Sequence, residues 1–281
     1  MSRPKVELDN FEAVYRYYES HEQNKAFAKF AHTVLSRVYK VSITADEGAG
    51  DAISQALANG ARIVISPNHL TGDDQYVIVS TAETFEPLRP IGGRAFIPSE
   101  PSLFRRRGWQ GKLLRNSCDG LGALPTFRLE DLRRQGVEIT DEINQQYRDA
   151  IELASKTQVS KLVAGHSMAG FWEGTRNRTD HRVVQPLKKG VAHTAIAAAE
   201  KVPVVLLPMG FYYGQEPEDY KKPVLPGAKR PYVHIGMPIP VETTDPDELV
   251  ALLHPEIQRC VDIVVERAGG QPLSKAETEA A

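Results

Sequence analysis

Three short apolar runs separated by helical patterns constrain the fold of this chain more than any other feature. The runs are Arg62–Ser66, Lys161–Ala164 and Val202–Leu207, and each is typical of a strand buried on both faces. Thr140 can cap a helix between the first two runs, and an alanine-rich helix near 191–201 precedes the third. This alternation predicts an α/β fold with a largely parallel central sheet flanked by helices.

The first 45 residues have a different pattern. Apolar side chains recur at helical spacing between Phe11 and Val41, which predicts one or two amphipathic helices in an N-terminal helical segment, residues 1–45. These helices either pack on the main domain or anchor the protein at a membrane surface.

The main α/β domain is expected to span residues 46–281. We expect a further strand at 233–237 and a helix that begins after Asp245 and is interrupted at Pro255. The polar tail from about residue 270 is expected to be disordered.

Composition excludes several classes of protein. The chain has 281 residues, of which 41% are hydrophobic and 25% charged, as in a folded globular protein. Two cysteines are too few for a disulfide framework, which favours the cytoplasm. The charged N-terminus does not fit a secretory signal, and the most continuous apolar stretch, 202–211, is too short to span a bilayer. A net charge of −2 gives no reason to expect nucleic-acid binding.

His69 and Asp74 form a candidate catalytic pair. They follow the first apolar run, with four residues between them and Gly72 in that gap. A tight turn lets the carboxylate fold back onto one ring nitrogen while the other faces a substrate, as a general base requires. A histidine that is hydrogen-bonded for structural reasons alone fits the same spacing.

A second polar segment, Phe171–Arg178, follows the second apolar run. Open α/β sheets bind ligands at the carboxyl ends of their strands, so this segment is a candidate binding loop. Arg176 can hold a phosphate through two hydrogen bonds, and Gly174 lets backbone N–H groups approach it. Arg178 fits a second phosphate contact or a solvated side chain, and Glu173 with Arg176 also fits a surface ion pair.

Four segments, in this order, resemble the motifs of the PlsC-type glycerolipid acyltransferases. Asn68–Asp74 looks like their H-x4-D motif, and Gly122–Arg128 is similar to the second motif, a glycine with an arginine six positions on. Phe171–Arg176 resembles the third motif, F-P-E-G-T-R, with Trp172 in place of proline. Val202–Pro208 resembles the fourth, an apolar strand with a proline near each end.

The resemblance implies an O-acyltransferase of phospholipid biosynthesis. Such an enzyme moves a fatty acyl group from an acyl thioester, either acyl-CoA or acyl carrier protein, to a hydroxyl of glycerol 3-phosphate or 1-acylglycerol 3-phosphate. His69 would be the general base, oriented by Asp74, and Arg128 and Arg176 would hold the phosphate. The other residues implied for the acceptor pocket are Glu173, Gly174, Thr175 and Arg178. No His, Cys or carboxylate cluster has metal-ligand spacing, so neither a metal nor a further cofactor is expected.

The sequence also departs from the family pattern. Phe127 replaces the acidic residue that often precedes the arginine of the second motif, and the larger Trp172 is expected to alter acceptor choice. The charged N-terminal segment favours a soluble or peripheral protein on the inner membrane face. A basic cluster, Arg105–Arg107 with Lys112 and Arg115, can attract the acyl donor or anionic lipid, or can be solvated.

Two alternative functions remain open from the sequence. Gly165–Ala169 resembles the nucleophile elbow of serine hydrolases, with Ser167 as nucleophile and Asp180 and His193 as partners. Gly170 and Gly174 follow closely, where an elbow should begin a helix. A lipid-binding relative without catalytic activity is the third possibility, and the intact His69 and Asp74 give it no support.

Overall fold

The computed structural model describes residues 3–106, 108–134, 136–214 and 230–273. Its strands form one sheet in the order β1-β7-β6-β2-β5-β3-β4, with β8 also paired to β6. The strands are β1 (Ser42–Ala45), β2 (Arg62–Pro67), β3 (Ala95–Ser99), β4 (Ala123–Pro125), β5 (Ser167–Ala169), β6 (Val204–Tyr212), β7 (Tyr232–Ile235) and β8 (Ile239–Pro240).

Most neighbouring strands run parallel, which confirms the predicted fold class. β2 lies between β5 and β6 and is parallel to both, and β3 is parallel to β5 and β4. β7 and β8 are antiparallel to β6, while β1 is parallel to β7. Because β2 and β5 are parallel neighbours, the loops that follow them leave the same edge of the sheet side by side.

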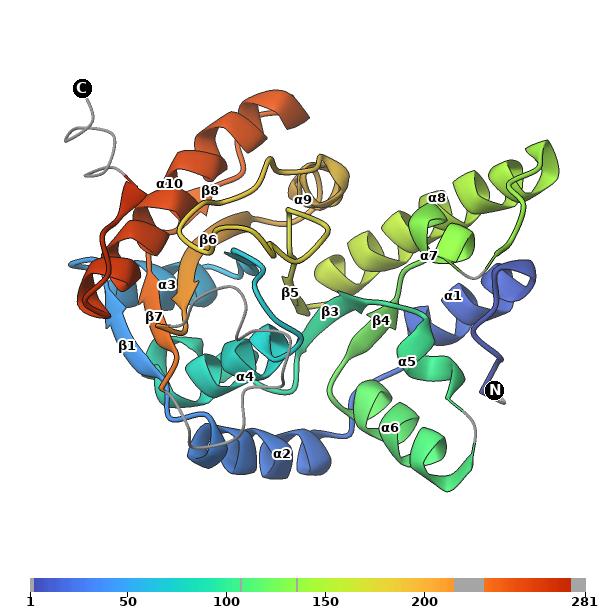
Figure 1. The fold of residues 1–281 in the computed structure, drawn as a ribbon, viewed down its shortest axis with the longest axis horizontal. Coiled ribbons are helices and arrows are strands. Elements are labelled where there is room, and N and C mark those ends of the chain that lie inside the picture. The colour runs from blue at the N-terminus through green and yellow to red at the C-terminus, as the bar shows by residue number, and fades with distance from the viewer. Residues whose placement is uncertain (1–2, 107, 135, 215–229, 274–281) are drawn as a thin grey trace.

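Helices cover both faces of this sheet (Figure 1). One face is covered by α3 (Ala49–Ala58) and α4 (Asp74–Thr84), with α2 (Lys25–Val38) packed against α4. The other is covered by α8 (Asp141–Val163), α9 (Gly190–Ala199) and α10 (Pro246–Arg267), with α1 (Phe11–Ser20) beside α8. Shorter elements are η1 (Leu8–Asn10), η2 (Glu86–Ile91), α5 (Ser102–Arg105), α6 (Gly108–Gly120) and α7 (Leu129–Arg134).

Strand β6 contains no charged residue because both of its faces are buried. In β6, Val204 and Leu206 pack in the core beneath α9 and α10, whereas Val205 and Leu207 pack in the core beneath α3 and α4. Successive side chains of a strand point to opposite faces, so a strand between two helical layers needs an apolar residue at every position. The continuous apolar run predicted from the sequence is therefore explained.

Two predicted elements were wrong. Lys161–Ala164 is not a strand: α8 continues to Val163, and the strand begins later, at Ser167. A short apolar run fits a buried helix as well as a buried strand, and here it completes a helix of 23 residues. Pro255 does not interrupt α10, which runs unbroken from Pro246 to Arg267.

The N-terminal segment joins the sheet as well as covering it. α1 and α2 confirm the helices expected between Phe11 and Val41. Strand β1 also lies within residues 1–45 and pairs with β7. Of the tail expected to be disordered, residues 274–281 lie outside the described residues.

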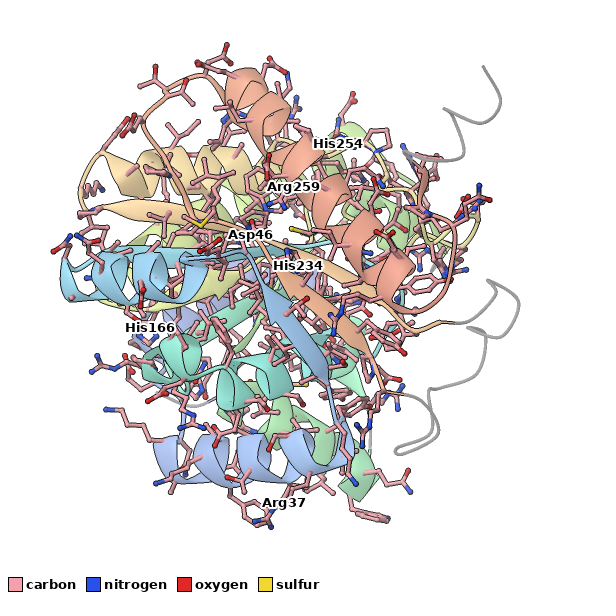
Figure 2. All side chains as sticks on the ribbon, turned by 90° about the vertical axis from the view of Figure 1, so that its left-hand side faces the viewer. Arg37, Asp46, His166, His234, His254 and Arg259 are labelled. Atoms are coloured by element: carbon pink, nitrogen blue, oxygen red, sulfur yellow. The ribbon has the colours of Figure 1, made fainter. Side chains whose placement is uncertain are left out.

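A polar cluster fastens β1 and β7 to α10 (Figure 2). Asp46, which follows β1, accepts hydrogen bonds from the guanidinium of Arg259 on α10 and lies 3.0 Å from Nε2 of His234 on β7. The Arg259 guanidinium lowers the pKa of Asp46 to about 2, so the carboxylate is ionised at neutral pH.

Among the helices of the described segments, none is long and apolar enough to cross a membrane.

Candidate active site

The turn after β2 brings His69 and Asp74 into direct contact. Nδ1 of His69 lies 2.8 Å from Oδ2 of Asp74, the first residue of α4. Asp74 is fully buried, whereas the His69 side chain keeps 18% of its surface exposed. The backbone folds back between the end of a strand and the start of a helix, as the spacing of the two residues predicted.

Besides His69, three residues donate hydrogen bonds to the carboxylate of Asp74. Its Oδ2 accepts the backbone N–H groups of Leu70 (2.6 Å) and Thr71 (2.9 Å). Its Oδ1 accepts the hydroxyls of Tyr213 (2.7 Å) and Thr71 (3.1 Å). Because backbone N–H groups and hydroxyls are directed at both of its oxygens, Asp74 acts as an acceptor, and it accepts the Nδ1–H of His69. Nε2 of the neutral ring is left with the lone pair that a general base needs.

The loop after β5 fixes the position of His69. The ring of Phe171 stacks on the imidazole with a centroid separation of 4.0 Å. Oε1 of Glu173 accepts the backbone N–H of His69 at 2.6 Å, and the N–H of Asn177 donates to the His69 carbonyl at 2.7 Å. The two neighbouring loops are thereby joined into one rigid unit, which suits a preorganised site.

Glu173 is a buried structural residue of the site and not an exposed binding group. Its side chain is buried, and its two oxygens accept the N–H groups of His69 and Gln185. Burial raises the pKa of Glu173 to about 7, the charge of Asp74 adds to that rise, and the two N–H donors oppose it. Glu173 therefore shapes the site from behind and has little surface with which to touch a ligand.

Three cationic side chains surround the same loop. Nη1 of Arg128 donates to the carbonyl of Gly174 at 3.2 Å. The guanidinium of Arg176 lies close to Gly72, where a Cβ atom would be 3.8 Å from Nη1, and Lys188 lies against Gly174, where a Cβ would be 2.9 Å from Cδ. We call Arg128, Arg176 and Lys188 the cationic cradle. Arg176 lies beside the His69–Asp74 turn, whereas Arg128 and Lys188 lie against Gly174, next to the Glu173 that accepts the His69 N–H. A phosphate is the natural ligand for such a group of cations.

Arg128 is oriented by a carboxylate that the motif comparison did not include. Its Nε and Nη2 donate to the two carboxylate oxygens of Asp131, at 2.8 and 3.2 Å. Phe127, which occupies the position of the usual acidic residue, is buried against Tyr15. The Asp131 carboxylate, three residues after Arg128, thus fixes the direction of its guanidinium.

The remaining predicted residues differ in where they lie. Thr175 and Arg178 are exposed on the loop, and Arg178 makes no hydrogen bond or ion pair with any residue in the described ranges. Trp172 is 1% exposed and donates its indole N–H to Ser66 at 2.9 Å. The expectation that Trp172 alters acceptor choice therefore lacks the required geometry, because its side chain faces the core.

The basic cluster expected to attract a donor or lipid is partly used inside the protein. Nε of Arg105 donates to the carbonyl of Val6, and Nη2 of Arg115 donates to the carbonyl of Pro4. Arg106 and Lys112 are exposed, and Arg107 lies outside the described residues.

Ser167 does not occupy a strand-to-helix turn. It begins β5, is almost fully buried, and its Oγ accepts the backbone N–H of Ile63 at 3.2 Å. Within the described part of the chain it hydrogen-bonds to neither Asp180 nor His193, and Asp180 pairs with Arg182. A nucleophile elbow requires an exposed serine between a strand and a helix, which this serine does not provide.

Sequence reasoning missed three residues of the site. Phe171 was considered only as part of a motif, and neither Lys188 nor Tyr213 was identified as a candidate. The signal available for Tyr213 was its place directly after the apolar strand β6, whose carboxyl end lies beside that of β2.

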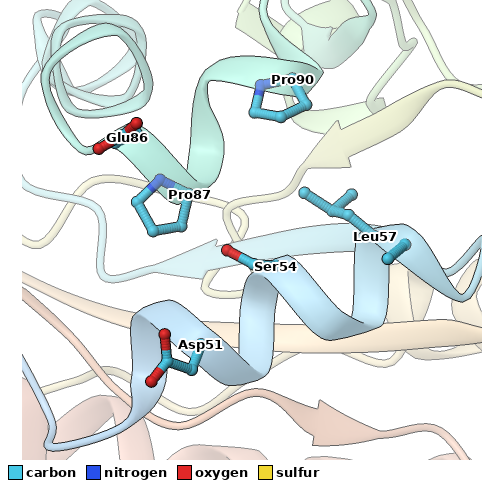
Figure 3. Close-up of a pocket in the computed structure, with 7 residues that line it drawn as sticks. Asp51, Ser54, Leu57, Glu86, Pro87 and Pro90 are labelled. Carbon is cyan, nitrogen blue, oxygen red and sulfur yellow. The ribbon is translucent and has the colours of Figure 1, made fainter.

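Figure 3 shows a surface hollow whose lining residues are not those of the candidate site. It measures about 540 Å³ and is lined by the carboxylates of Asp51 and Glu86 together with Pro87 and Pro90. The hollow is distant from the candidate site, because Asp74 begins α4 whereas Glu86 lies beyond the other end of this helix, which is about 16 Å long at 1.5 Å per residue. The carboxylates of Asp51 and Glu86 repel anions, so the hollow does not suit the ligand that fits the cationic cradle. No group of three or more His, Cys, Asp or Glu side chains in the described residues is arranged to hold a metal ion.

Neither family models nor curated proteins include a detectable relative of this chain. A scan against protein-family models found no matching family, and a search of the curated proteins found no matching protein. The function of this chain is therefore inferred from its residues and their geometry.

Proposed function

We propose that this protein is an O-acyltransferase that moves a fatty acyl group from an acyl thioester to a hydroxyl of a phosphorylated glycerol. The observation that supports this function is that the His69–Asp74 pair and the cationic cradle lie on adjoining loops at one edge of the sheet, with Arg176 against Gly72 of the His69–Asp74 turn. A phosphate held by the cradle would present a neighbouring hydroxyl to the imidazole. Glycerol 3-phosphate and 1-acylglycerol 3-phosphate both have this chemistry.

The reaction needs one proton transfer to His69 and one from it. Nε2 of His69 takes the hydroxyl proton as the oxygen attacks the thioester carbonyl. The C–O bond forms, the C–S bond breaks, and the imidazolium returns the proton to the departing thiolate. General-base assistance of this kind contributes about 10²–10⁴ in rate, and positioning of the acceptor contributes much of the rest. No cofactor is needed, because acyl-CoA or acyl carrier protein is itself a substrate.

The test is a panel of acceptors and donors on the purified protein. Each phosphorylated acceptor is combined with acyl-CoA and with acyl carrier protein, and products are identified by mass spectrometry. We expect an ester of at least one phosphorylated acceptor and no product from unphosphorylated glycerol at the same concentration. If the thioester is hydrolysed and no ester forms with any acceptor, the proposed function is overturned.

We also propose that the protein is located in the cytoplasm and attached peripherally to the inner membrane face.

A further inference from the structure

Helix α2 exposes both of its phenylalanines to solvent. Phe27, Phe30 and Val34 follow one another at spacings of three and four residues and so share one side of the helix, with Phe30 67% exposed. The side packed against the core contains Ala28 and His32, both buried, with Leu35 and Val38 partly buried. A surface helix of a globular protein normally buries its aromatic residues on the packed side.

Helix α6 extends this apolar surface. Trp109 is 73% exposed, and Leu113, one turn later, is also exposed. The two helices meet where the ring of Phe27 covers Gly120: a Cβ atom there would lie 2.5 Å from the ring. Both helices lie along the lower edge of the molecule in Figure 1. We call Phe27, Phe30, Val34, Trp109 and Leu113 the α2–α6 apolar surface.

The exposed charges on α2 and α6 and directly before α6 are positive. Glu22, an exposed carboxylate three residues before α2, lies beside His166. The exposed cations are Lys25, Lys29, Arg37, Arg106 and Lys112. Helix α2 contains no carboxylate, and the single carboxylate of α6, Asp119, is buried and bound by Tyr18 and Arg3. Figure 2 shows Arg37 at the lower end of the molecule, pointing away from its body. The surface is thus locally cationic although the whole chain has a net charge of −2.

We infer that the α2–α6 apolar surface docks on a phospholipid bilayer that contains anionic headgroups. Exposed aromatic and aliphatic side chains flanked by Lys and Arg are the features of helices that lie in the plane of a membrane interface. The aromatic rings of Phe30 and Trp109 enter the boundary between headgroups and acyl chains, and the cations contact the negative headgroups. Neither helix crosses the bilayer.

Docking would place the candidate active site near the lipid. Helix α2 packs against α4, and the ring of Tyr39, at the end of α2, stacks on Tyr76 in the first turn of α4. That turn also contains Asp74. Docking itself needs no acyl transfer, so it is measured without donor or acceptor and holds or fails independently of the proposed function.

The chain contains its own fluorescent reporter of docking. It has two tryptophans, of which Trp109 is on the proposed surface and Trp172 is buried in the core. Addition of phosphatidylcholine vesicles that contain phosphatidylglycerol should shift the emission to shorter wavelength, and added salt should weaken the shift. Pure phosphatidylcholine vesicles should give a much smaller shift. Trp109→Phe should remove the shift while the protein still sediments with the anionic vesicles.

Charge substitutions on matched apolar residues decide the case. Phe30→Glu should weaken sedimentation with anionic vesicles by about tenfold or more, because it removes one anchor and adds repulsion. Leu252→Glu is the control: it also introduces a glutamate at an exposed apolar residue, on helix α10, which lies at the opposite edge of Figure 1 from α2. Equal binding by both variants would overturn the inference. So would the absence of vesicle binding, including the case in which this surface binds only a soluble acidic carrier protein.

Discussion

The phenol of Tyr213 donates a hydrogen bond of 2.7 Å to Oδ1 of Asp74, whose other oxygen lies 2.8 Å from Nδ1 of His69. Tyr213 is fully buried, and burial together with the Asp74 charge raises its pKa well above the ordinary value. It is therefore a permanent donor. Through this bond the end of β6 helps to fix the carboxylate that orients the candidate base.

Tyr213→Phe should impair turnover without removing it. The change leaves the ring but deletes one of the donors to a buried carboxylate, a bond worth about 1.5–3 kcal/mol. We expect kcat to fall about tenfold while KM for both substrates changes little, because Asp74 then holds the His69 ring less firmly in the catalytic position. An unchanged kcat would show that Tyr213 does not position the pair.

Arg176→Ala and Lys188→Ala should each weaken recognition of the phosphate. Loss of one charge-assisted hydrogen bond to a phosphate costs about 1.5–3 kcal/mol, so kcat/KM for the phosphorylated acceptor should fall about 10- to 100-fold, mainly through KM. Arg148→Ala, which removes an exposed arginine of α8, is the matched control. If KM for the acceptor rises equally in all three variants, the effect is one of general charge, and the cradle is not the phosphate site.

Glu173→Gln should change how stability depends on pH. The pKa of Glu173 is raised from an ordinary value of 4.5 to about 7, so between these pH values the folded protein binds more protons than the unfolded chain. Glu173 therefore contributes its stabilisation below about pH 4.5 and loses it as pH rises through 7. The loss is at most about 1.4 kcal/mol per pH unit.

The neutral glutamine cannot titrate, so the variant lacks this slope. Urea unfolding at several pH values from 4.5 to 8 should show the stability of the wild-type protein falling relative to Glu173→Gln and the difference levelling above pH 7. A constant difference between the two proteins over this range would mean that Glu173 titrates near its ordinary value.

The fold class could be predicted because its strongest signals are local. Ile63, Val64 and Ile65 of β2 and the run Val204–Leu207 of β6 are all apolar, since each strand lies between two helical layers. The error at Lys161–Ala164 arose because a short apolar run does not distinguish a strand from the last turn of a buried helix. Only packing decides between them, and packing is not written in the local sequence.

The error at Pro255 has an energetic explanation. A proline inside a helix costs about 3 kcal/mol. Helix α10 buries Leu249, Leu253, Ile257 and Val261 against the sheet, and each such side chain contributes about 1.5–3 kcal/mol. Burial of that face outweighs the cost, so the helix continues through the proline.

The contacts of the candidate site that are local in sequence could also be predicted, whereas the long-range contacts could not. His69 and Asp74 are five positions apart, so their contact follows from one turn and could be predicted. Tyr213 lies 139 positions from Asp74 and meets it only because β6 is the parallel neighbour of β2. Lys188 reaches Gly174 in the same non-local manner. Such contacts depend on strand order, which a single sequence does not display.

His69→Ala, compared with wild type and with His193→Ala, tests the central claim most directly. The control removes an exposed histidine of α9. Acyl transfer to the preferred phosphorylated acceptor is measured for all three proteins, with thermal unfolding to verify the fold. We predict that His69→Ala loses about 10²–10⁴ in kcat while its unfolding stays cooperative, and that His193→Ala keeps its activity. A folded His69→Ala protein that turns over at the wild-type rate would contradict the account.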